Sequence, residues 1–324
     1  MSSASPQSRL EPLEHKSMQE FGETFIQALP RHRRNLKIPG RTLEENQRRQ
    51  PLLACVGNVA EVQDAMLEVL NHSITQDAQL AAESAFRAFL EKPAIDSSVL
   101  SFFNGWNETH KTTSLVSAKI IMRLSADAIS VSPDRREGYH NVMAHMHEVA
   151  KDDFGLGHQG HDGMYNYMTA AFGASAWVEE QFKIAECNDF ADFLYNTGVA
   201  KHKTALNSQE HKSSIMDAMM VSIASELWNG REYNFIAQYI EAKLLAANPF
   251  LRTNTQNLRN AKGYVMGHSG EVENKHGLHA LAAAQAYGRT VGLEFKPARL
   301  KGIMLNYNER VGNAFSAMHR TMTS

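Results

Sequence analysis

The chain has 324 residues, of which 43% are hydrophobic, and its 33 Lys and Arg face 35 Asp and Glu. The apolar content supports a buried core and excludes wholesale disorder, while a net charge of -2 excludes a general nucleic-acid binder, which carries a basic excess. Two cysteines, the lack of any segment with the ~20 apolar residues of a membrane helix, and an N-terminus without a signal-peptide pattern lead us to expect a cytoplasmic protein that binds no membrane.

Residues 1–50 carry the weakest structural pattern. Serines and a proline open this segment, Arg31 to Arg41 form a basic run, and Ile38-Pro39-Gly40 is a turn signal. We therefore predict a partly ordered N-terminal arm over 1–50. Residues 51–324 are predicted to form a single helical domain.

From residue 51 onward, apolar residues recur at helical spacing and strand-like alternation is scarce. Asn58 with Glu61 has the pattern of a capping box, Asp77 is a candidate N-cap of a helix that Pro93 ends, and Pro133 precedes an acidic helix start. These signals predict an all-α fold. The expected helices follow 58, 77, 133 and the glycines near 157, and cover 112–129, 208–228, 231–247, 263–291 and 308–321.

A first cluster of ionisable residues lies where the chain is expected to bend. Glycines interrupt this segment, so an acid before the bend and a histidine after it can converge. A polar connection between two helices, with capping residues, explains the same pattern, and the residues alone leave both interpretations open. The cluster contains His145, His147, Glu148, Asp152, Asp153, His158, His161 and Asp162.

A second cluster lies in the segment GHSGEVENKHGLHA. Glu273 and His276 are three residues apart and share a helix face, with His279 three residues further on. Carboxylate and imidazole together suit iron, manganese or zinc, and a small-residue apolar run follows, so this face is expected to point inward. Glu226 lies among apolar residues and is a further candidate, whereas Glu232, beside an arginine and after a glycine, is expected to be more exposed.

Three segments resemble those of one family, the haem-oxygenase-like diiron oxidases and oxygenases. MHEVAKDDFGLGHQGHDGMY resembles the family's motif of an acidic pair, Gly-x-Gly, a histidine and a tyrosine after a hydrophobic residue. SGEVENKHGLHALAAA resembles its later helix, in which an acid and a histidine three residues apart bind iron, and SIASELW lies where the family carries a single Glu. The resemblance covers roughly residues 115–292.

The resemblance implies a haem-oxygenase-like bundle of about seven core helices. It further implies an iron- and oxygen-dependent oxidoreductase with two weakly held Fe(II) ions per chain and O2 as co-substrate. Its substrate would be a small molecule that undergoes N-oxygenation, desaturation or oxidative C–C cleavage, and a homodimer is a further family expectation. The implied metal ligands are Asp153, His161, Glu226, Glu273 and His276, with His279 beside them or completing the set; Asp152 and His268 remain further candidates.

Three other interpretations remain open. The first is a ferritin-like diiron oxidase, in which two Glu-x-x-His pairs bind the metals together with two further acids. The second is a metal-free haem-oxygenase-like module that binds a small molecule, and the third is a helical interaction protein that docks through the basic arm. The ferritin-like set would consist of Glu137, His140, Glu273 and His276, with Glu108 and Glu241 as the further acids.

Overall fold

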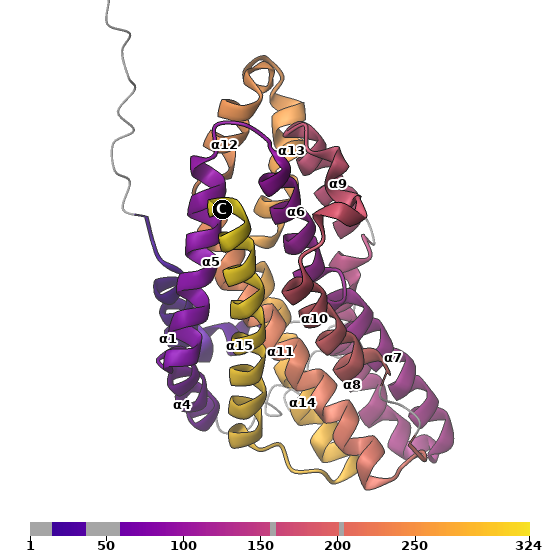
Figure 1. Ribbon diagram of the computed structural model, residues 1–324. Helices are drawn as coiled ribbons and strands as arrows, with labels where there is room; N and C mark the ends of the chain where they lie inside the picture. Colours follow the sequence, from indigo (N-terminus) through magenta and orange to yellow (C-terminus); the bar gives the residue numbers. More distant parts are fainter. Residues whose placement is uncertain (1–14, 37–58, 156–159, 201–203) are drawn as a thin grey trace, which may run out of the picture.

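The computed structural model describes residues 15–36, 59–155, 160–200 and 204–324, and every regular element within these ranges is a helix (Figure 1). The predicted all-α fold is therefore confirmed. The α-helices are α1 (Met18–Asn35), α4 (Val59–Leu70), α5 (Ser73–Glu91), α6 (Ser97–His110), α7 (Thr113–Ser130), α8 (Pro133–Asp153), α9 (His161–Ala171), α10 (Ala185–Leu194), α11 (Gln209–Ala237), α12 (Ile240–Ala247), α13 (Thr255–His268), α14 (Val272–Val291) and α15 (Pro297–Thr323).

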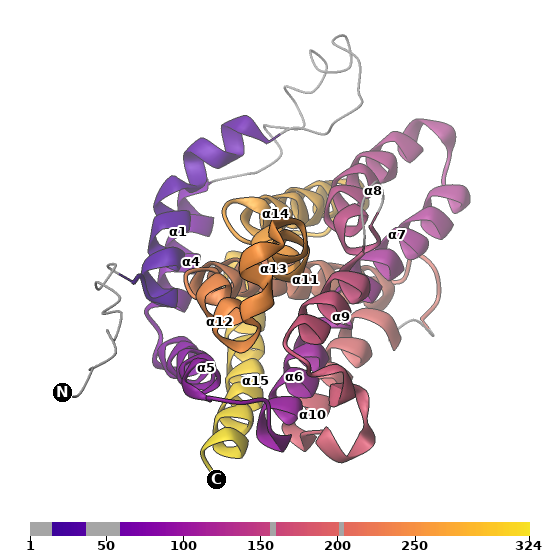
Figure 2. The same ribbon diagram turned by 90° about the horizontal axis from the view of Figure 1, so that it is seen from above.

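Helix α11 forms the centre of the bundle. Every residue from 218 to 233 is buried, and a helix that is buried on all sides must lie inside the fold rather than on its surface. Helices α1, α7, α13, α14 and α15 pack around it, as the view from above shows (Figure 2). None of the described helices combines the length and the apolarity that crossing a membrane requires.

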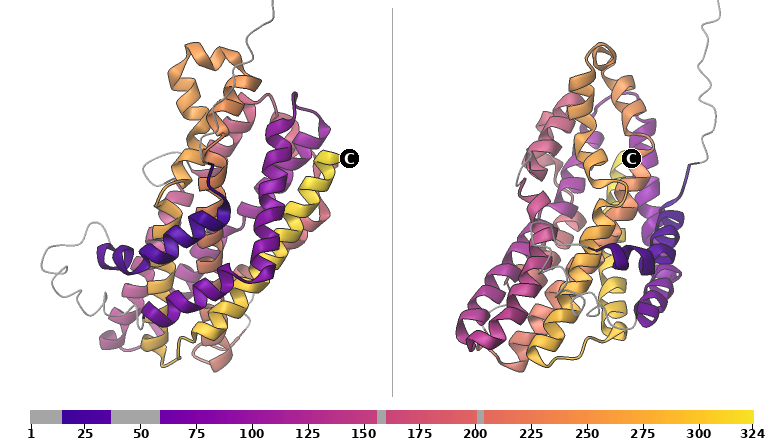
Figure 3. Two further views of the ribbon diagram at one scale, coloured as in Figure 1. Left: turned by 90° about the vertical axis from the view of Figure 1, so that its left-hand side faces the viewer. Right: turned by 180° about the vertical axis from the view of Figure 1, so that it is seen from behind.

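Three columns of the bundle are each broken into two helices near mid-height. The chain separates α6 from α7 at 111–112, α8 from α9 at 154–160, and α13 from α14 at 269–271. Figures 1 and 3 show α6, α9 and α13 in the upper half and α7, α8 and α14 in the lower half, while α11 runs through both. We call the level at which these helix ends meet the break plane.

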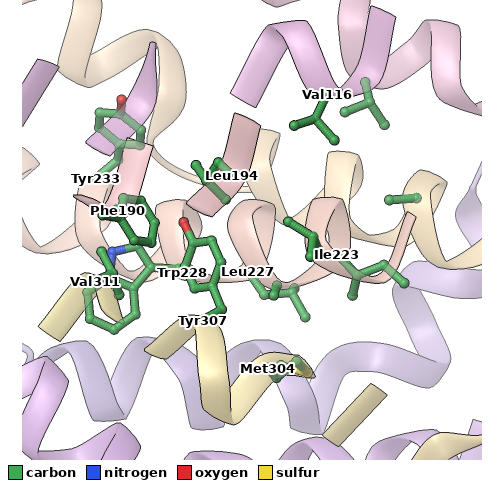
Figure 4. Packing of buried hydrophobic residues seen from close by; sticks show 14 of the residues in the cluster. Val116, Phe190, Leu194, Ile223, Leu227, Trp228, Tyr233, Met304, Tyr307 and Val311 are labelled. Atoms are coloured by element: carbon green, nitrogen blue, oxygen red, sulfur yellow. The ribbon is translucent and has the colours of Figure 1, made fainter. Parts of the chain in front are cut away.

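An aromatic core fills the upper half between α5, α6 and α15. Phe89 of α5 stacks on Phe102 of α6, with ring centroids 5.0 Å apart. Phe86 meets the same ring edge-to-face at 5.8 Å, and Trp106 lies 5.3 Å from Phe86. Such ring pairs add to the energy of apolar burial. Figure 4 shows the continuation of this core around Trp228 and its neighbours on α15.

Helices α1 and α4 lie side by side on the outside of the bundle. The Ser17 side chain accepts a hydrogen bond from the Glu20 amide, and the Glu20 carboxylate accepts one from the Ser17 amide, so a capping box starts α1. The apolar side of α1 is buried in the common core through Met18, Phe25 and Leu29. The predicted N-terminal arm therefore contains a well-packed helix.

Several helix boundaries differ from those the sequence predicts. His72, not Asp77, is the N-cap of α5, because its Nδ1 accepts a hydrogen bond from the Ile74 amide. No local signal in the sequence predicts α6. The sequence pattern divides the helix near Gly230, whereas α11 continues through this position. A Cβ at Gly230 would lie 2.7 Å from the Asn274 side chain, so the close approach of α14 favours glycine there.

The helix predicted over 263–291 is interrupted. Helix α13 ends at His268 and α14 begins at Val272, with Gly270 between them at a φ of +74°. That backbone conformation strongly favours glycine. The interruption matters for function, because it places Glu273 in the first turn of a new helix that faces the middle of α11.

Candidate metal centre

Glu226, Glu273 and His276 form the three-residue cluster at the centre of the molecule. One donor atom from each lies within 4.8 Å of the others, and the three residues are 2%, 3% and 5% exposed. His276 Nδ1 is 3.6 Å from Glu226 Oε2 and 3.4 Å from Glu273 Oε2. Two carboxylates and one imidazole therefore converge from α11 and α14.

Local sequence explains how these side chains come together. Glu273 and His276 lie one helical turn apart, so they project from the same side of α14, and an acid in the first turn is favoured by the helix dipole. Gly277 allows the close approach, because a Cβ there would lie 2.9 Å from the Leu227 side chain and 3.5 Å from Glu226.

Glu226 is an incompletely satisfied carboxyl group. Its Oε1 is buried and has no hydrogen-bond partner among the described residues. Burial raises the pKa of Glu226 to about 8, and the neighbouring Glu273 carboxylate adds to this, although His276 opposes it. A buried acid with an unused oxygen, next to a second acid, fits a divalent cation that would compensate both.

A second group of possible ligands spans two of the breaks. Asp153 at the end of α8 has Oδ1 3.2 Å from His161 Nε2 at the start of α9. The His161 ring lies 4.1 Å from that of His268, at the end of α13. His268 Nδ1 donates to the carbonyl of Tyr264, which leaves its Nε2 with the lone pair that a metal ligand needs.

His268 also lies within electrostatic reach of the three-residue cluster. Burial lowers the pKa of His268 to about 4, and the charges of His276 and His110 act in the same direction, while the Tyr264 carbonyl and Glu226 oppose them. The imidazole is therefore neutral at physiological pH, which is the protonation state that binds metals.

Two tyrosines separate these groups from the aromatic core. Tyr233 donates a hydrogen bond of 2.6 Å to Tyr264, and both rings are buried. The Tyr233 ring lies 4.9 Å from His268 and 5.3 Å from His110, and the Tyr264 ring lies 5.8 Å from His161. Burial raises the pKa of both phenols, so both remain protonated.

Glu232 is fully buried, although the sequence analysis expected it to be more exposed. Its carboxylate accepts hydrogen bonds of 2.6 Å from the indoles of Trp106 and Trp228, and His110 Nε2 lies 3.2 Å away. Burial opposes protonation of His110, but the Glu232 carboxylate outweighs it and holds the pKa of His110 above its usual value. Glu232 and His110 thus form a buried ion pair near the site.

His279 lies outside the three-residue cluster. Its Nδ1 is 3.0 Å from Nδ1 of His145 on α8, so one imidazole must donate and the other accept. Burial and the nearby histidines hold the pKa of His279 at about 2, which keeps this ring neutral. The resemblance implied two roles for His279, either beside the metal ligands or as one of them. Its position in this structure fits the role beside the ligands.

The ferritin-like ligand set does not assemble. Glu137, His140 and Glu241 are exposed. Gly138 packs against Thr290, near the end of α14, whereas Glu273 lies in the first turn of that helix. Glu108 is buried but lies 2.5 Å from Lys111 Nζ. Antiparallel packing of α8 on α14 thus places the two Glu-x-x-His pairs at opposite ends.

Some candidates from the sequence lie outside what the structure describes, namely Asn58, Cys55, His158 and the side chain of Asp152. Sequence reasoning in turn missed His110 and Tyr233, and misjudged Glu232. No local signal marks them, since polar residues lie next to each of them in the sequence, and their proximity to the cluster depends on the packing of α6 against α11 and α13.

The arrangement offers oxygen and nitrogen donors in a buried setting, with neutral imidazoles and protonated phenols around them. Carboxylate and imidazole donors suit Fe(II), Mn(II) or Zn(II). No protein-family model, curated protein or solved structure matches the chain. The chemistry of these residues is therefore the basis for a function.

Proposed function

We propose that the protein is a non-haem iron enzyme that activates dioxygen to oxidise a small molecule, on a haem-oxygenase-like bundle. The observation that carries the proposal is the buried convergence of Glu226, Glu273 and His276. These three residues would hold one Fe(II). Asp153, His161 and His268 would supply donors for a second ion across the break plane.

The donor set is the main argument for iron. Carboxylate-rich ligation with imidazole is typical of helical bundles that bind two irons, because anionic oxygens stabilise the ferric state. Bound ferrous iron supplies the one-electron steps that allow dioxygen to react with organic molecules. A structural zinc site, in contrast, commonly has cysteine among its ligands, and Cys187 lies elsewhere, against α15.

The chain's own residues would prepare the site for this chemistry. Glu226 carries a proton in the metal-free protein at neutral pH and must release it on metal binding. Tyr233 and Tyr264 exclude water on one side. The His110–Glu232 pair holds a proton next to Tyr233, at a ring distance of 5.3 Å, and thus keeps a proton donor close to the site.

The decisive experiment is an anaerobic Fe(II) titration of the metal-free protein, with bound iron measured directly and oxygen uptake recorded after mixing with air. We expect two irons per chain and oxygen consumption that depends on them. His276→Ala and Glu226→Gln should lose the first ion, whereas His161→Ala should keep one ion and lose the second. Mössbauer spectra of the oxidised protein report whether the two irons are coupled.

Exposed residues of the same type supply the control. His140→Ala and Glu137→Gln should bind iron as the wild type does, because both lie far along α8 from the cluster. Normal iron content in His276→Ala would refute the ligand assignment. Zinc binding without any oxygen reaction would refute the oxidase, and no metal binding at all would favour a metal-free small-molecule module.

A further inference from the structure

Helix α7 carries a row of exposed apolar side chains on its outer side, which we call the α7 stripe. Leu115, Met122 and Ile129 are 46%, 64% and 78% exposed, and none of the described segments covers them. They follow one another at intervals of seven residues, so they lie on one side of the helix along about 21 Å of its length. Figures 1 and 2 show α7 at the outer edge of the bundle.

Small residues lie between these three side chains. Ala118 is half-buried and Ala126 is exposed, so a neighbouring helix could approach closely between the larger residues. Lys119 is the one charged side chain of α7 that reaches the surface, because Arg123 and Asp127 are buried. Heptad spacing of large apolar residues is the pattern through which two helices pack side by side, and contiguous apolar surface marks an interaction site.

The border of the stripe towards α8 is basic. Ser125 Oγ of α7 lies 3.1 Å from Met143 Sδ of α8, so this contact marks where the two helices meet. Arg136, His140 and His147 are spaced by three, four and seven residues and share that side of α8 with Met143. His140 and His147 are exposed and Arg136 is half-buried, so this border presents a guanidinium and two imidazoles to solvent.

The opposite border is acidic. There the π-helical segment Tyr195–Ala200 packs on α7, and Asn207 Nδ2 lies 3.5 Å from Ser130 Oγ at the end of α7. Asp192 and Glu210 lie just before and just after these contacts in the chain, and both are exposed. The stripe thus separates a basic border from an acidic one.

We propose that the α7 stripe binds the same stripe of a second copy of this chain, about a two-fold axis that runs along the helix. Such an axis pairs each large apolar residue with its own counterpart, as the equivalent positions of a parallel coiled coil do. It also brings the basic border of each copy against the acidic border of the other. An axis perpendicular to the helix would instead bring like charges together.

The charges also favour a second copy over a membrane surface. A helix that lies on a membrane is rich in Lys and Arg beside its apolar face, whereas Asp192 and Glu210 border one side of this stripe. The stripe lies on the outside of the bundle, and the three-residue cluster lies at its centre. Dimer formation therefore requires no metal, and this proposal holds or fails independently of the proposed iron chemistry.

The test is sedimentation velocity of the full-length, metal-free protein. Because the stripe is short, we expect a monomer–dimer equilibrium with a Kd on the order of 10–100 µM, so concentrations from about 1 to 500 µM cover the transition. Salt should weaken the dimer, because it screens the charged borders. A monomer throughout this range would overturn the proposal, and would assign the stripe to a membrane if that monomer bound phosphatidylserine vesicles.

Variants locate the interface. Met122→Glu places like charges together at the centre of the contact and should weaken the dimer at least tenfold. Leu80→Glu is the matched control, because Leu80 is 65% exposed on α5, which Figure 2 shows on a different side of the bundle. Both positions are exposed, and circular dichroism verifies folding. Unchanged dimerisation of Met122→Glu, or an equal loss in Leu80→Glu, would disprove the interface.

Disulfide cross-linking tests the direction of the axis. The experiment uses a chain with Cys55→Ser, in which Cys187 is buried. Leu115→Cys, Met122→Cys and Ile129→Cys should each give a disulfide-linked dimer under mild oxidation, because each position faces its own counterpart. With an axis perpendicular to the helix, only Met122→Cys, at the midpoint, would cross-link, and that result would overturn the proposed arrangement.

Discussion

The aromatic core and the break plane use burial in opposite ways. In the aromatic core, Phe86 is surrounded by other rings, and its burial is favourable because it removes apolar surface from water. At the break plane, Glu226 and Glu273 are buried to a similar degree, although burying a carboxylate is unfavourable. The first region stabilises the fold. The second buries carboxyl groups at a cost in stability that a bound ligand can offset.

Glu232 shows that a buried carboxylate in this protein need not remain unsatisfied. Two indole N–H groups and His110 surround it, whereas Glu226 keeps an oxygen without a partner. The two acids are six residues apart on the same helix. The difference between them indicates a structural role for Glu232 and a ligand role for Glu226, because functional sites commonly trade stability for chemistry.

The largest expected effect comes from removing a ring of the aromatic core. Phe86→Ala should lower the free energy of unfolding of the metal-free protein by about 3–5 kcal/mol, since it leaves a cavity in contact with several rings. Urea denaturation measures this change. Phe250→Ala, at a position that is 85% exposed, is the control with little effect. A loss below ~1 kcal/mol for Phe86→Ala would show that the core repacks.

Glu226→Gln should have the opposite sign. Burial raises the pKa of Glu226 from 4.5 to about 8, so ionisation of this acid lowers the free energy of unfolding of the metal-free protein as the pH rises through that interval. At pH 7 the free energy of unfolding of the variant should therefore exceed that of the wild type by on the order of 2 kcal/mol. Near pH 4.5 the two proteins should be equally stable. Thermal denaturation across this pH range tests it, and equal stability at all pH values would contradict a buried, unsatisfied acid.

The smallest effect concerns the capping residue of α6. Asp96 accepts hydrogen bonds from Ser98 Oγ and from the Val99 amide, and mainly the Ser98 bond lowers its pKa to about 2. Asp96→Ala should cost about 1 kcal/mol at neutral pH. Because the folded-state pKa is depressed, this difference should disappear as the pH falls from about 4 to 2.

Acid titrations of the two proteins, followed by circular dichroism, measure that difference. Asp189→Ala serves as the control, since Asp189 is an exposed acid inside α10. A constant difference between pH 4 and 2 would show that the Asp96 carboxylate does not cap the helix in its charged form.

Local signals predicted the helices that have clear ends. Pro133 lies at the first position of α8, and α7 begins within one residue of the predicted start, because proline and helical periodicity act locally. Helix α6 escaped prediction, since FFNGW mixes apolar residues with Asn104 and Gly105, and its burial against α10 and α15 stabilises it. The continuity of α11 through Gly230 likewise depends on its neighbours.

The same distinction applies to the candidate site. The spacing of Glu273 and His276 predicted a shared face because one helical turn relates them, and Glu226 was a candidate for its apolar surroundings. The contact between His161 and His268 could not be predicted, because it requires the break before α14 that the sequence analysis had read as continuous helix.

The breaks at mid-height also determine how rigidly each set of candidate ligands is held. Glu226, Glu273 and His276 belong to two continuous helices in close contact, so their mutual distances are fixed by the lower half of the bundle. Asp153 ends α8, whereas His161 begins α9 and His268 ends α13. Any tilt of α9 and α13 against α8 therefore changes the spacing of these three side chains. Binding of a second ion would thus depend on how the upper half of the bundle is oriented relative to the lower half.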